Sequence, residues 1–379
     1  NRRKFLTLRR FMKSIDKSET VGYNIGMKFI HMADAHLGSK MEAKLPGEKA
    51  KIRRAEIRAT FLRSVEYAYK TGAQVYVIAG DLFDMDKPLK KDKEFFYDTV
   101  KRFPSIDFLY LRGNHDDALD GENLPNLKTF SKEWTYYRYG KVVFAGIELS
   151  GENSLSLYSS LRLGEDDINV VIMHGDISEG AGEDKIKLPL LKDKNIDYLA
   201  LGHIHRSYAK SLGSRGIARY SGCLEGRGFD ETGEKGFYEV TVDENEKRLD
   251  SKFTSLSART VYRYEIDVSS AENPSDVYSL VKSSVKAKSG DLVRVELVGE
   301  REYADENVAE DVEAYLKDSY FFVSVKDKTV KKYYAKDFAG DKSLRGEFVR
   351  QVLASDLSEE KKSEIIALGL KALSGREVD

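Results

Sequence analysis

The chain has 379 residues and a nearly balanced charge, with 62 Lys and Arg against 63 Asp and Glu. This length suffices for two domains, and the charge balance gives no overall sign of nucleic-acid binding, which would show as an excess of basic residues. Any contact with DNA must therefore be local or be carried by metal ions. The single cysteine, Cys223, excludes an intramolecular disulfide and fits a reducing compartment, so we expect a cytoplasmic protein.

Residues 1–26 form a basic leader that we set apart from the fold. Apolar residues recur there at helical spacing among arginines, which predicts a basic amphipathic helix. The leader is either an arm that contacts DNA or a partner, or a packing helix or tag remnant, because the sequence reads like a natural start at Met27. No apolar run in the chain is long enough for a membrane span, and no signal peptide is visible. We therefore expect no membrane association.

From Met27 the chain alternates apolar strands with helical segments. Two amphipathic helices are predicted at 53–70 and 93–103. Strands are predicted at 28–33, 74–80, 107–113, 141–149, 168–176 and 197–205. The alternation predicts an α/β fold. Polar clusters follow most of these strands, at the sheet edge where ligands bind in such folds, so the placement itself indicates a site.

Five of the six histidines fall in these clusters, which read DAH, GNHDD, HGD and GHIH, and a further cluster, GDLFD, adds two aspartates. Asp34 and His36 stand two residues apart, as do His203 and His205. In extended backbone each pair projects to one side, as chelation requires. Imidazoles and carboxylates together suit manganese, iron or zinc. The sixth histidine, His31, lies inside the first strand and is expected to be a satisfied core residue.

The ordered set D-x-H, GD-x-x-D, GNHD, HG and GH-x-H resembles the calcineurin-like metallophosphoesterase superfamily. The resemblance implies a β-sandwich flanked by helices that holds two divalent metal ions. Manganese is the expected metal, and iron, zinc or cobalt would suit the same ligands. The resemblance assigns one metal to Asp34, His36, Asp81 and His205, and the other to Asp81, Asn114, His174 and His203, with Asp81 as the bridge.

His115 and Asp84 are the predicted catalytic residues. In this superfamily the histidine of GNHD sits beside the metals, where an imidazolium can protonate the leaving oxygen or stabilise developing negative charge. Asp84 is expected to orient His115, because a carboxylate fixes the tautomer of an imidazole. Two metals about 3.5 to 4 Å apart can clamp the attacking and leaving oxygens of a phosphoryl displacement. Asp116 and Asp117 are expected to support the site or lie at the surface.

A narrower resemblance is to the SbcD-type DNA-repair exonucleases, bacterial relatives of the meiotic-recombination double-strand-break nuclease. The stretches that carry it lie between Met27 and Asp243 and read MKFIHMADAHLGS, GDLFDMDKP, LRGNHD, ALGHIHRSY and YSGCLEGRGFDETGEKGFYEVTVD. It implies a two-metal DNA exonuclease, with endonuclease activity also open, that acts in repair with an SMC-like coiled-coil ATPase of the SbcC type. Asp84 stands where many archaeal and eukaryotic members have histidine, which leaves the cleavage polarity open. Cys223 replaces a frequent serine and is expected to be buried and inert.

Two other functions stay open besides the nuclease. A phosphodiesterase or phosphatase acting on small nucleotides would use the same metals, and a metal-bearing scaffold would recruit a partner without chemistry. The extra segments after the first domain favour the nuclease over the small-substrate enzyme. The presence of every ligand and of His115 speaks against a scaffold.

The pattern predicts a metallophosphoesterase (nuclease) domain at 27–257, an α+β capping domain at 258–335 and a C-terminal helical segment at 336–379. The cap either shapes the access of DNA to the metals or is an accessory fold without substrate contact. The two C-terminal amphipathic helices either grip the ATPase or pack on the chain's own core. The chain can also form a homodimer.

Overall fold

The computed structural model describes residues 26–41, 45–84, 88–116, 119, 123–154, 156–180, 182–301, 307–331 and 338–373. Most of the predicted leader, residues 1–25, and Asp117 lie outside the described residues. Among the helices that are described, none combines the length and the apolar character that crossing a membrane requires.

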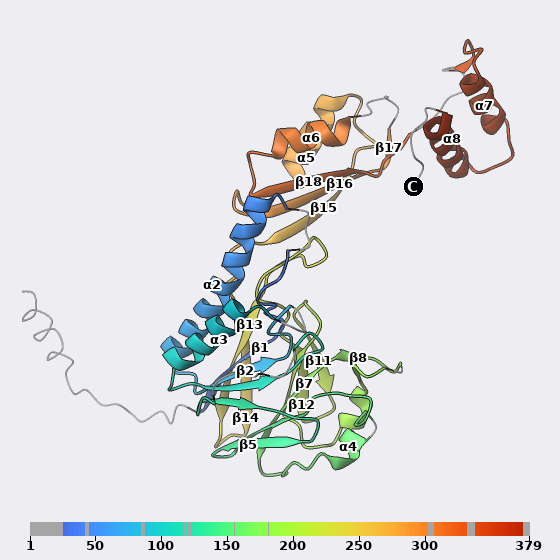
Figure 1. The fold of residues 1–379 in the computed structure, drawn as a ribbon. Helices are drawn as coiled ribbons and strands as arrows, with labels where there is room; N and C mark the ends of the chain where they lie inside the picture. Colours follow the sequence, from blue (N-terminus) through green and yellow to red (C-terminus); the bar gives the residue numbers. More distant parts are fainter. Residues whose placement is uncertain are drawn as a thin grey trace, which may run out of the picture.

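Two six-stranded sheets face each other (Figure 1). The first has the order β14 (Arg248–Ser255), β13 (Gly236–Asp243), β1 (Lys28–Met32), β2 (Val75–Ala79), β3 (Asp107–Leu111), β4 (Leu127–Thr129). The second has the order β11 (Tyr208–Leu212), β12 (Gly216–Tyr220), β10 (Tyr198–Gly202), β7 (Ile168–His174), β6 (Val142–Gly146), β5 (Thr135–Tyr139). Strands β1 to β4 run parallel, as do β6, β7, β10 and β12, so each sheet brings several carboxyl ends to one edge.

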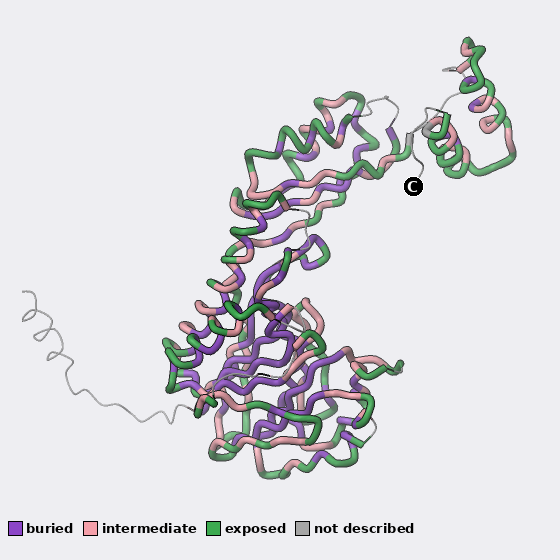
Figure 2. The backbone as a smooth tube through the Cα atoms, in the orientation of Figure 1, coloured by how far each residue is buried: buried purple, intermediate pink, exposed green. Residues whose placement is uncertain are grey.

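The apolar side chains explain why the sheets stack. Phe29, Val77, Phe144 and Val170 meet between the two sheets and are fully buried. Helices α2 (Gly47–Thr71) and α3 (Lys90–Arg102) cover the outer face of the first sheet, while α4 (Ser156–Ser160) and the 3₁₀ turn η1 (Leu188–Leu191) cover the second. Burying each large apolar side chain contributes about 1.5 to 3 kcal/mol. The predicted β-sandwich flanked by helices is confirmed, and the buried residues concentrate in it (Figure 2).

His31 is the core residue that its position in the first strand predicted. Its Nε2 lies 3.2 Å from the carbonyl oxygen of Leu201, and its Nδ1 lies 2.9 Å from the Tyr198 hydroxyl. Burial lowers the pKa of His31 to about 3, so the ring stays neutral with both nitrogens satisfied.

A smaller unit follows the sandwich. Its parallel sheet has the order β15 (Val261–Asp267), β16 (Leu292–Val298), β18 (Phe322–Asp327). Helices α5 (Pro274–Ser284) and α6 (Val308–Leu316) pack on one face of this sheet. A short strand pair, β17 (Glu300–Arg301) with β19 (Val330–Lys331), follows this sheet, and another, β8 (Asp176–Ile177) with β9 (Lys185–Ile186), lies between β7 and β10 of the sandwich. This unit has the α+β character predicted for it, and the boundary at residue 257 stays a prediction.

Aromatic contacts join the cap to the sandwich. The guanidinium carbon of Arg259 lies 3.6 Å from the centre of the Phe321 ring, and Lys49 at the start of α2 lies 5.6 Å from the same ring. Figure 1 shows α2 reaching from the sandwich to the cap sheet. Phe229, from a loop of the sandwich, stacks on Phe322 of β18 with ring centroids 6.1 Å apart.

Helices α7 (Leu344–Leu353) and α8 (Glu359–Leu373) pack on each other at the far end of the molecule (Figure 1). Val349 and Ile366 are fully buried. A Cβ atom on Gly369 would lie 2.1 Å from the Phe348 ring, so glycine allows the two helices to approach closely. Among the described residues, α8 borders β19 and neither helix packs on the core of the sandwich.

Candidate metal centre

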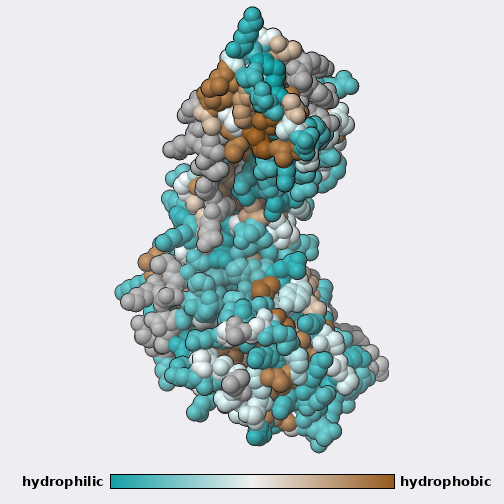
Figure 3. Space-filling view, turned by 90° about the vertical axis from the view of Figure 1, so that its right-hand side faces the viewer, coloured by the Kyte–Doolittle hydropathy of each residue, from teal (hydrophilic) through white to brown (hydrophobic). Residues whose placement is uncertain are grey.

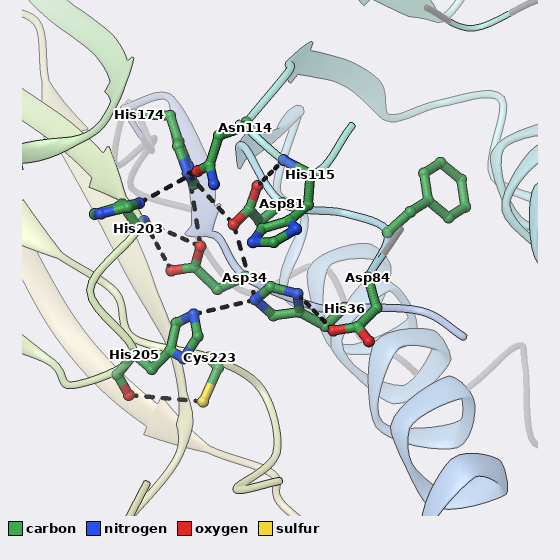
Figure 4. Close-up of polar contacts among 12 residues, drawn as sticks. Asp34, His36, Asp81, Asp84, Asn114, His115, His174, His203, His205 and Cys223 are labelled. Carbon is green, nitrogen blue, oxygen red and sulfur yellow. Dashed lines mark hydrogen bonds and ion pairs between the residues drawn. The ribbon is translucent and has the colours of Figure 1, made fainter. Parts of the chain in front are cut away.

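The loops that follow β1, β2, β3, β7 and β10 meet at one place (Figure 4). They bring together Asp34, His36, Asp81, Asn114, His115, His174, His203 and His205. These are the predicted metal ligands and the predicted proton donor, contributed by segments up to 171 positions apart in the chain, from Asp34 to His205. The described structure therefore gathers the strand-end clusters of both sheets into one site.

The first predicted ligand group converges on a common point. Each of Asp34, His36, Asp81 and His205 offers one ligand atom, and these atoms all lie within 4.8 Å of one another. His36 Nε2 and His205 Nε2 are 3.1 Å apart. Two nitrogens that each lie about 2.1 Å from a metal, at tetrahedral to octahedral angles, are about 3.0 to 3.4 Å apart. The observed spacing fits a metal ion held between the two rings.

The second predicted group lies beside the first. Asn114 Oδ1 is 2.9 Å from His174 Nε2 and 3.3 Å from His203 Nδ1. Asp81 Oδ2 is 3.4 Å from His174 Nε2 and 3.9 Å from His36 Nε2, so this carboxylate touches both groups, as a bridge requires. The three distances within the second group, 2.9 to 3.4 Å, are close to the same ligand spacing, and the distance to His36 is longer. His174 Nδ1 lies 2.9 Å from the carbonyl oxygen of Ala79, an acceptor that holds a proton on Nδ1 and leaves Nε2 as the atom that faces the other ligands.

Each of the two histidines of the first group has a carboxylate beside its Nδ1 atom, on the side of the ring away from the other histidine. His36 Nδ1 lies 3.1 Å from Asp84 Oδ1, and His205 Nδ1 lies 2.7 Å from Glu231 Oε1. A carboxylate on Nδ1 keeps the proton there and makes Nε2 the better electron donor to a metal, an arrangement that metal-binding histidines commonly use. Glu231 was not predicted as part of the site. No pattern near it in the sequence indicates this role.

The predicted pairing of Asp84 with His115 is wrong. Its carboxylate lies against His36, and Arg227 Nη1 donates to the same Oδ1 at 2.5 Å. The reason is the path of the backbone. The Asp84 amide donates to the carbonyl oxygen of Leu37 at 3.2 Å, which keeps the GDLFD loop alongside the DAH loop. Asp84 therefore supports a ligand and does not orient His115.

His115 lies beside the first ligand group. Its backbone amide donates to Asp81 Oδ1 at 3.1 Å, and its ring centroid is 5.8 Å from that of His36 (Figure 4). The ring is not among the converging ligand atoms. This position suits a group that reaches a substrate bound at the metals, and the catalytic role of His115 stays a prediction.

Asp116 fixes the GNHD loop to the GDLFD loop. Its carboxylate accepts the backbone amides of Gly113 at 3.0 Å, Leu82 at 3.2 Å and Phe83 at 2.9 Å. Burial raises the pKa of Asp116, and these three donors act against that rise. The sequence left its role undecided, although its place next to His115 could have indicated one.

Several ligands have unusual backbone conformations. Positive φ angles occur at Asp34 (54°), His36 (48°), Asp81 (49°) and His203 (102°). The expectation that the two-residue pairs sit in extended backbone is therefore wrong, because left-handed turns aim these side chains instead. Such conformations cost about 1 to 3 kcal/mol each and collect at functional sites. At Gly80, with φ of 91°, a Cβ atom would lie 2.1 Å from His174 Nδ1, so only glycine fits.

The charges of the site favour a cation. Burial raises the pKa of Asp34 to about 7. Burial acts in the same direction on Asp81, but its contact with His174 holds the pKa of Asp81 well below the usual range. Burial lowers the pKa of His36 to about 4, which leaves its ring neutral. Burial opposes a charge on His174, but the contact with Asp81 raises the pKa of His174 to about 9, so a proton on this ring balances the Asp81 carboxylate. A divalent ion held by the same residues would replace that proton as the counter-charge.

A cavity of about 300 Å³ opens beside the second ligand group. Asn114 and His174 form part of its wall, together with Arg112, Lys132 and Glu148. Arg112 Nε donates to Glu148 Oε1 at 2.8 Å, and Nη2 donates to Oε2.

Elsewhere at the site, Cys223 is buried, and burial raises the pKa of its thiol, which agrees with the inert role expected.

Comparisons with known proteins find similarity to phosphoesterases. Residues 27–207 match the family described as calcineurin-like phosphoesterase. The chain is 27% identical over 298 residues to the uncharacterized metallophosphoesterase YhaO of Bacillus subtilis, covering 72% of this chain and 71% of YhaO. It is 26% identical over 199 residues to the DNA double-strand break repair protein Mre11 of Sulfurisphaera tokodaii, covering 47% of this chain and 49% of that protein. The chain thus spans about half the length of that relative.

Among solved structures, the chain is similar to a dimetal phosphatase from Danio rerio, with a TM-score of 0.42 and 13% identity. The similarity covers 60% of this chain and 96% of that chain. The family match supports a metal-dependent phosphoester hydrolase. The narrower SbcD-type resemblance stays a prediction.

Proposed function

Because residues 27–207 belong to the calcineurin-like phosphoesterases, metal-dependent hydrolases of phosphoesters, we propose that this chain is a two-metal DNA nuclease. It would hydrolyse phosphodiester bonds at DNA ends during repair, with manganese as the metal. The observation that carries the hydrolase is the pair of ligand groups that share Asp81. The similarity to a DNA double-strand break repair protein supports DNA as the substrate.

The position of the cap also supports a large substrate. Phe229 packs in the cap cluster with Val261 and Leu292, and two residues further along the chain Glu231 binds the ligand His205. The cap is thus connected directly to the ligand groups. A folded unit beside the metals can select a duplex end or a strand over a small phosphate ester.

The chemistry follows from the residues present. Two divalent ions, when bound, polarise the phosphoryl oxygens and make a strong nucleophile available near neutral pH. Asp81 would hold both ions at a fixed spacing. His36 and His205 would present Nε2 to one ion, because carboxylates retain the protons on Nδ1. His115 would give a proton to the leaving oxygen from its position beside this group.

The test compares two substrates under one set of conditions. The purified chain is given duplex DNA with free ends and, separately, bis-p-nitrophenyl phosphate, with manganese, magnesium or EDTA. We expect manganese-dependent shortening of the DNA. Asp81→Asn should abolish it, while Asp250→Asn, at an exposed carboxylate on β14, serves as the matched control. Intact DNA beside hydrolysed small ester would refute the nuclease, and retained metals without any hydrolysis would favour a scaffold.

The cavity favours a second candidate, a phosphodiesterase or phosphatase for small nucleotides. Its volume of about 300 Å³ is at the lower end of the range for small-ligand pockets, and it borders Asn114 and His174. Lys132 and Arg112 could contact a phosphate or sugar there. The same two-substrate assay decides between the candidates, since an enzyme of this kind would cleave a dinucleotide and leave duplex DNA intact.

We further propose that α7 and α8 bind an SMC-like coiled-coil ATPase. Apolar side chains on and between these helices are exposed, namely Leu344 (73%), Leu357 (40%), Ile365 (38%), Leu368 (53%) and Leu373 (46%). Figure 3 shows hydrophobic residues gathered at this end of the molecule. A paired helix surface with an apolar stripe is suited to docking another helix or coiled coil.

A double variant tests this partner. Leu344→Glu with Leu368→Glu should abolish co-purification with the SMC-like ATPase while hydrolysis of bis-p-nitrophenyl phosphate is retained. Leu190→Glu, on η1, changes a leucine of similar exposure (47%) away from these helices and should leave the association intact. Unchanged association of the double variant would refute the proposed surface.

A further inference from the structure

The guanidinium of Arg227 lies behind the first ligand group and touches both carboxylates that support it. Its Nη1 donates to Asp84 Oδ1 at 2.5 Å, and its Nη2 donates to Glu231 Oε1 at 2.8 Å. The side chain is only 12% exposed. Arg227 is therefore enclosed by the site, and its Nη2 also lies 3.2 Å from Nδ1 of the predicted ligand His205.

These contacts form a closed ring of five side chains. From Arg227 the ring passes through Asp84 to His36 Nδ1 on one side, and through Glu231 to His205 Nδ1 on the other. The Nε2 atoms of the two histidines, 3.1 Å apart, complete it. A shift of either carboxylate would thus turn one imidazole away from the other.

We propose that Arg227 is a positioning residue for the metal held by His36 and His205. By joining Asp84 and Glu231 it fixes both imidazoles at once, so that their Nε2 atoms point at one metal position. The inference rests on the ligand assignment of the proposed function. It does not depend on DNA as the substrate, because its readout is metal affinity.

The shape of arginine suits this task. A planar guanidinium can bind two carboxylates at fixed directions, whereas the single ammonium of lysine can satisfy both only if they move together. Arg227 also donates its backbone amide to Glu231 Oε2 at 2.7 Å, which closes the turn between the two residues. Within that turn, Phe229 is anchored in the cap by Phe322 and by Arg294, whose guanidinium carbon lies 4.1 Å from the ring centre.

Arg227 could instead act only as a counter-charge, and this simpler role predicts the opposite change in metal affinity when Arg227 is removed. If Arg227 acted only through its positive charge, its removal would strengthen the binding of a nearby cation, because a repulsive charge would be gone. If it positions the ligands, removal weakens binding. Arg227→Lys separates the two roles further, since lysine keeps the positive charge but lacks the planar guanidinium that binds two carboxylates.

The experiment titrates metal-free full-length protein with manganese by calorimetry and measures both dissociation constants. We expect Arg227→Met and Arg227→Lys each to weaken one metal position by about 10- to 100-fold, the range for supporting residues of metal ligands, and to leave the other within about twofold. His36→Ala identifies the affected position, because it should weaken the same one, and Asn114→Ala should weaken the other. Cobalt absorption spectra of the same proteins report the altered ligand geometry.

Arg138→Met is the matched control. Arg138 makes a two-pronged pair with Asp167, at 2.7 and 2.8 Å, on β5 away from the site. Its loss should change neither constant. Unchanged or tighter binding in Arg227→Met would overturn the positioning role, as would equal weakening of both positions, which would indicate a general loss of structure. Binding restored fully in Arg227→Lys would likewise overturn it, because charge alone would then suffice.

Discussion

Replacing His115 by alanine separates metal holding from chemistry. The ring is not among the four converging ligand atoms, and the contact that His115 makes with Asp81 uses the backbone amide. His115→Ala therefore keeps all four converging ligand atoms and the backbone hydrogen bond to Asp81. We therefore expect full metal content, unchanged DNA binding and a large loss of hydrolysis.

The size of that loss follows from the proposed role. A missing general acid typically costs 10²- to 10⁴-fold in rate, which corresponds to about 2.7 to 5.4 kcal/mol of transition-state stabilisation. The loss should depend on the leaving group. A nitrophenolate leaves without protonation, whereas the sugar oxygen of DNA needs a proton. His115→Ala should therefore impair hydrolysis of bis-p-nitrophenyl phosphate much less than cleavage of DNA.

Single-turnover rates on both substrates, with metal content measured on the same samples, test this reasoning. Three outcomes contradict it. Loss of a metal ion from His115→Ala would make His115 a ligand, and an equal rate loss on both substrates would make its ring a charge stabiliser and not a proton donor. A wild-type rate on DNA would remove it from the chemistry altogether.

Two further predictions concern the bridge and the cap. Asp81→Asn should lose metal from both positions, because Asp81 Oδ2 faces His174 and His36; elemental analysis that finds two ions per chain would disprove the bridge. Phe229→Ala should lower the free energy of unfolding by about 3 to 5 kcal/mol, since Phe229 is 4% exposed; denaturant unfolding measures this, and Leu190→Ala at an exposed site should cost far less.

The sequence identified the candidate ligands that the structure gathers at one place because their signals are local. Each cluster follows a strand of buried apolar residues, and parallel strands bring their carboxyl ends to one edge. The i, i+2 spacing of Asp34 and His36 identified them as a pair, although the reason given was incorrect. Their left-handed backbone angles depend on tertiary contacts, such as the hydrogen bond from the Asp34 amide to the carbonyl oxygen of Gly80. Spacing alone cannot reveal such contacts.

The supporting layer of the site could not be predicted in the same way. Asp84 was identified, but its partner was wrong, because the choice between His36 and His115 depends on how two loops lie against each other. Arg227 and Glu231 carry no local signal. They follow β12 by several residues, in a loop whose contacts with β1 and β2 segments span more than 140 positions. Contacts of this kind depend on how the two sheets stack, and they produce no periodic pattern of residues in the sequence.

The residues of the site carry energetic costs of their own. Four ligands in left-handed backbone together cost about 4 to 12 kcal/mol, and the buried carboxylates of Asp34 and Asp81 add desolvation. The apolar layer between the sheets offsets these costs, since each fully buried residue such as Phe29 or Phe144 contributes about 1.5 to 3 kcal/mol. A sandwich selected for stability alone would hold apolar side chains and relaxed turns at this edge. The strain and the buried charges fit the proposed metal site, because a bound cation would give Asp34, His36, Asp81 and His205 one common partner.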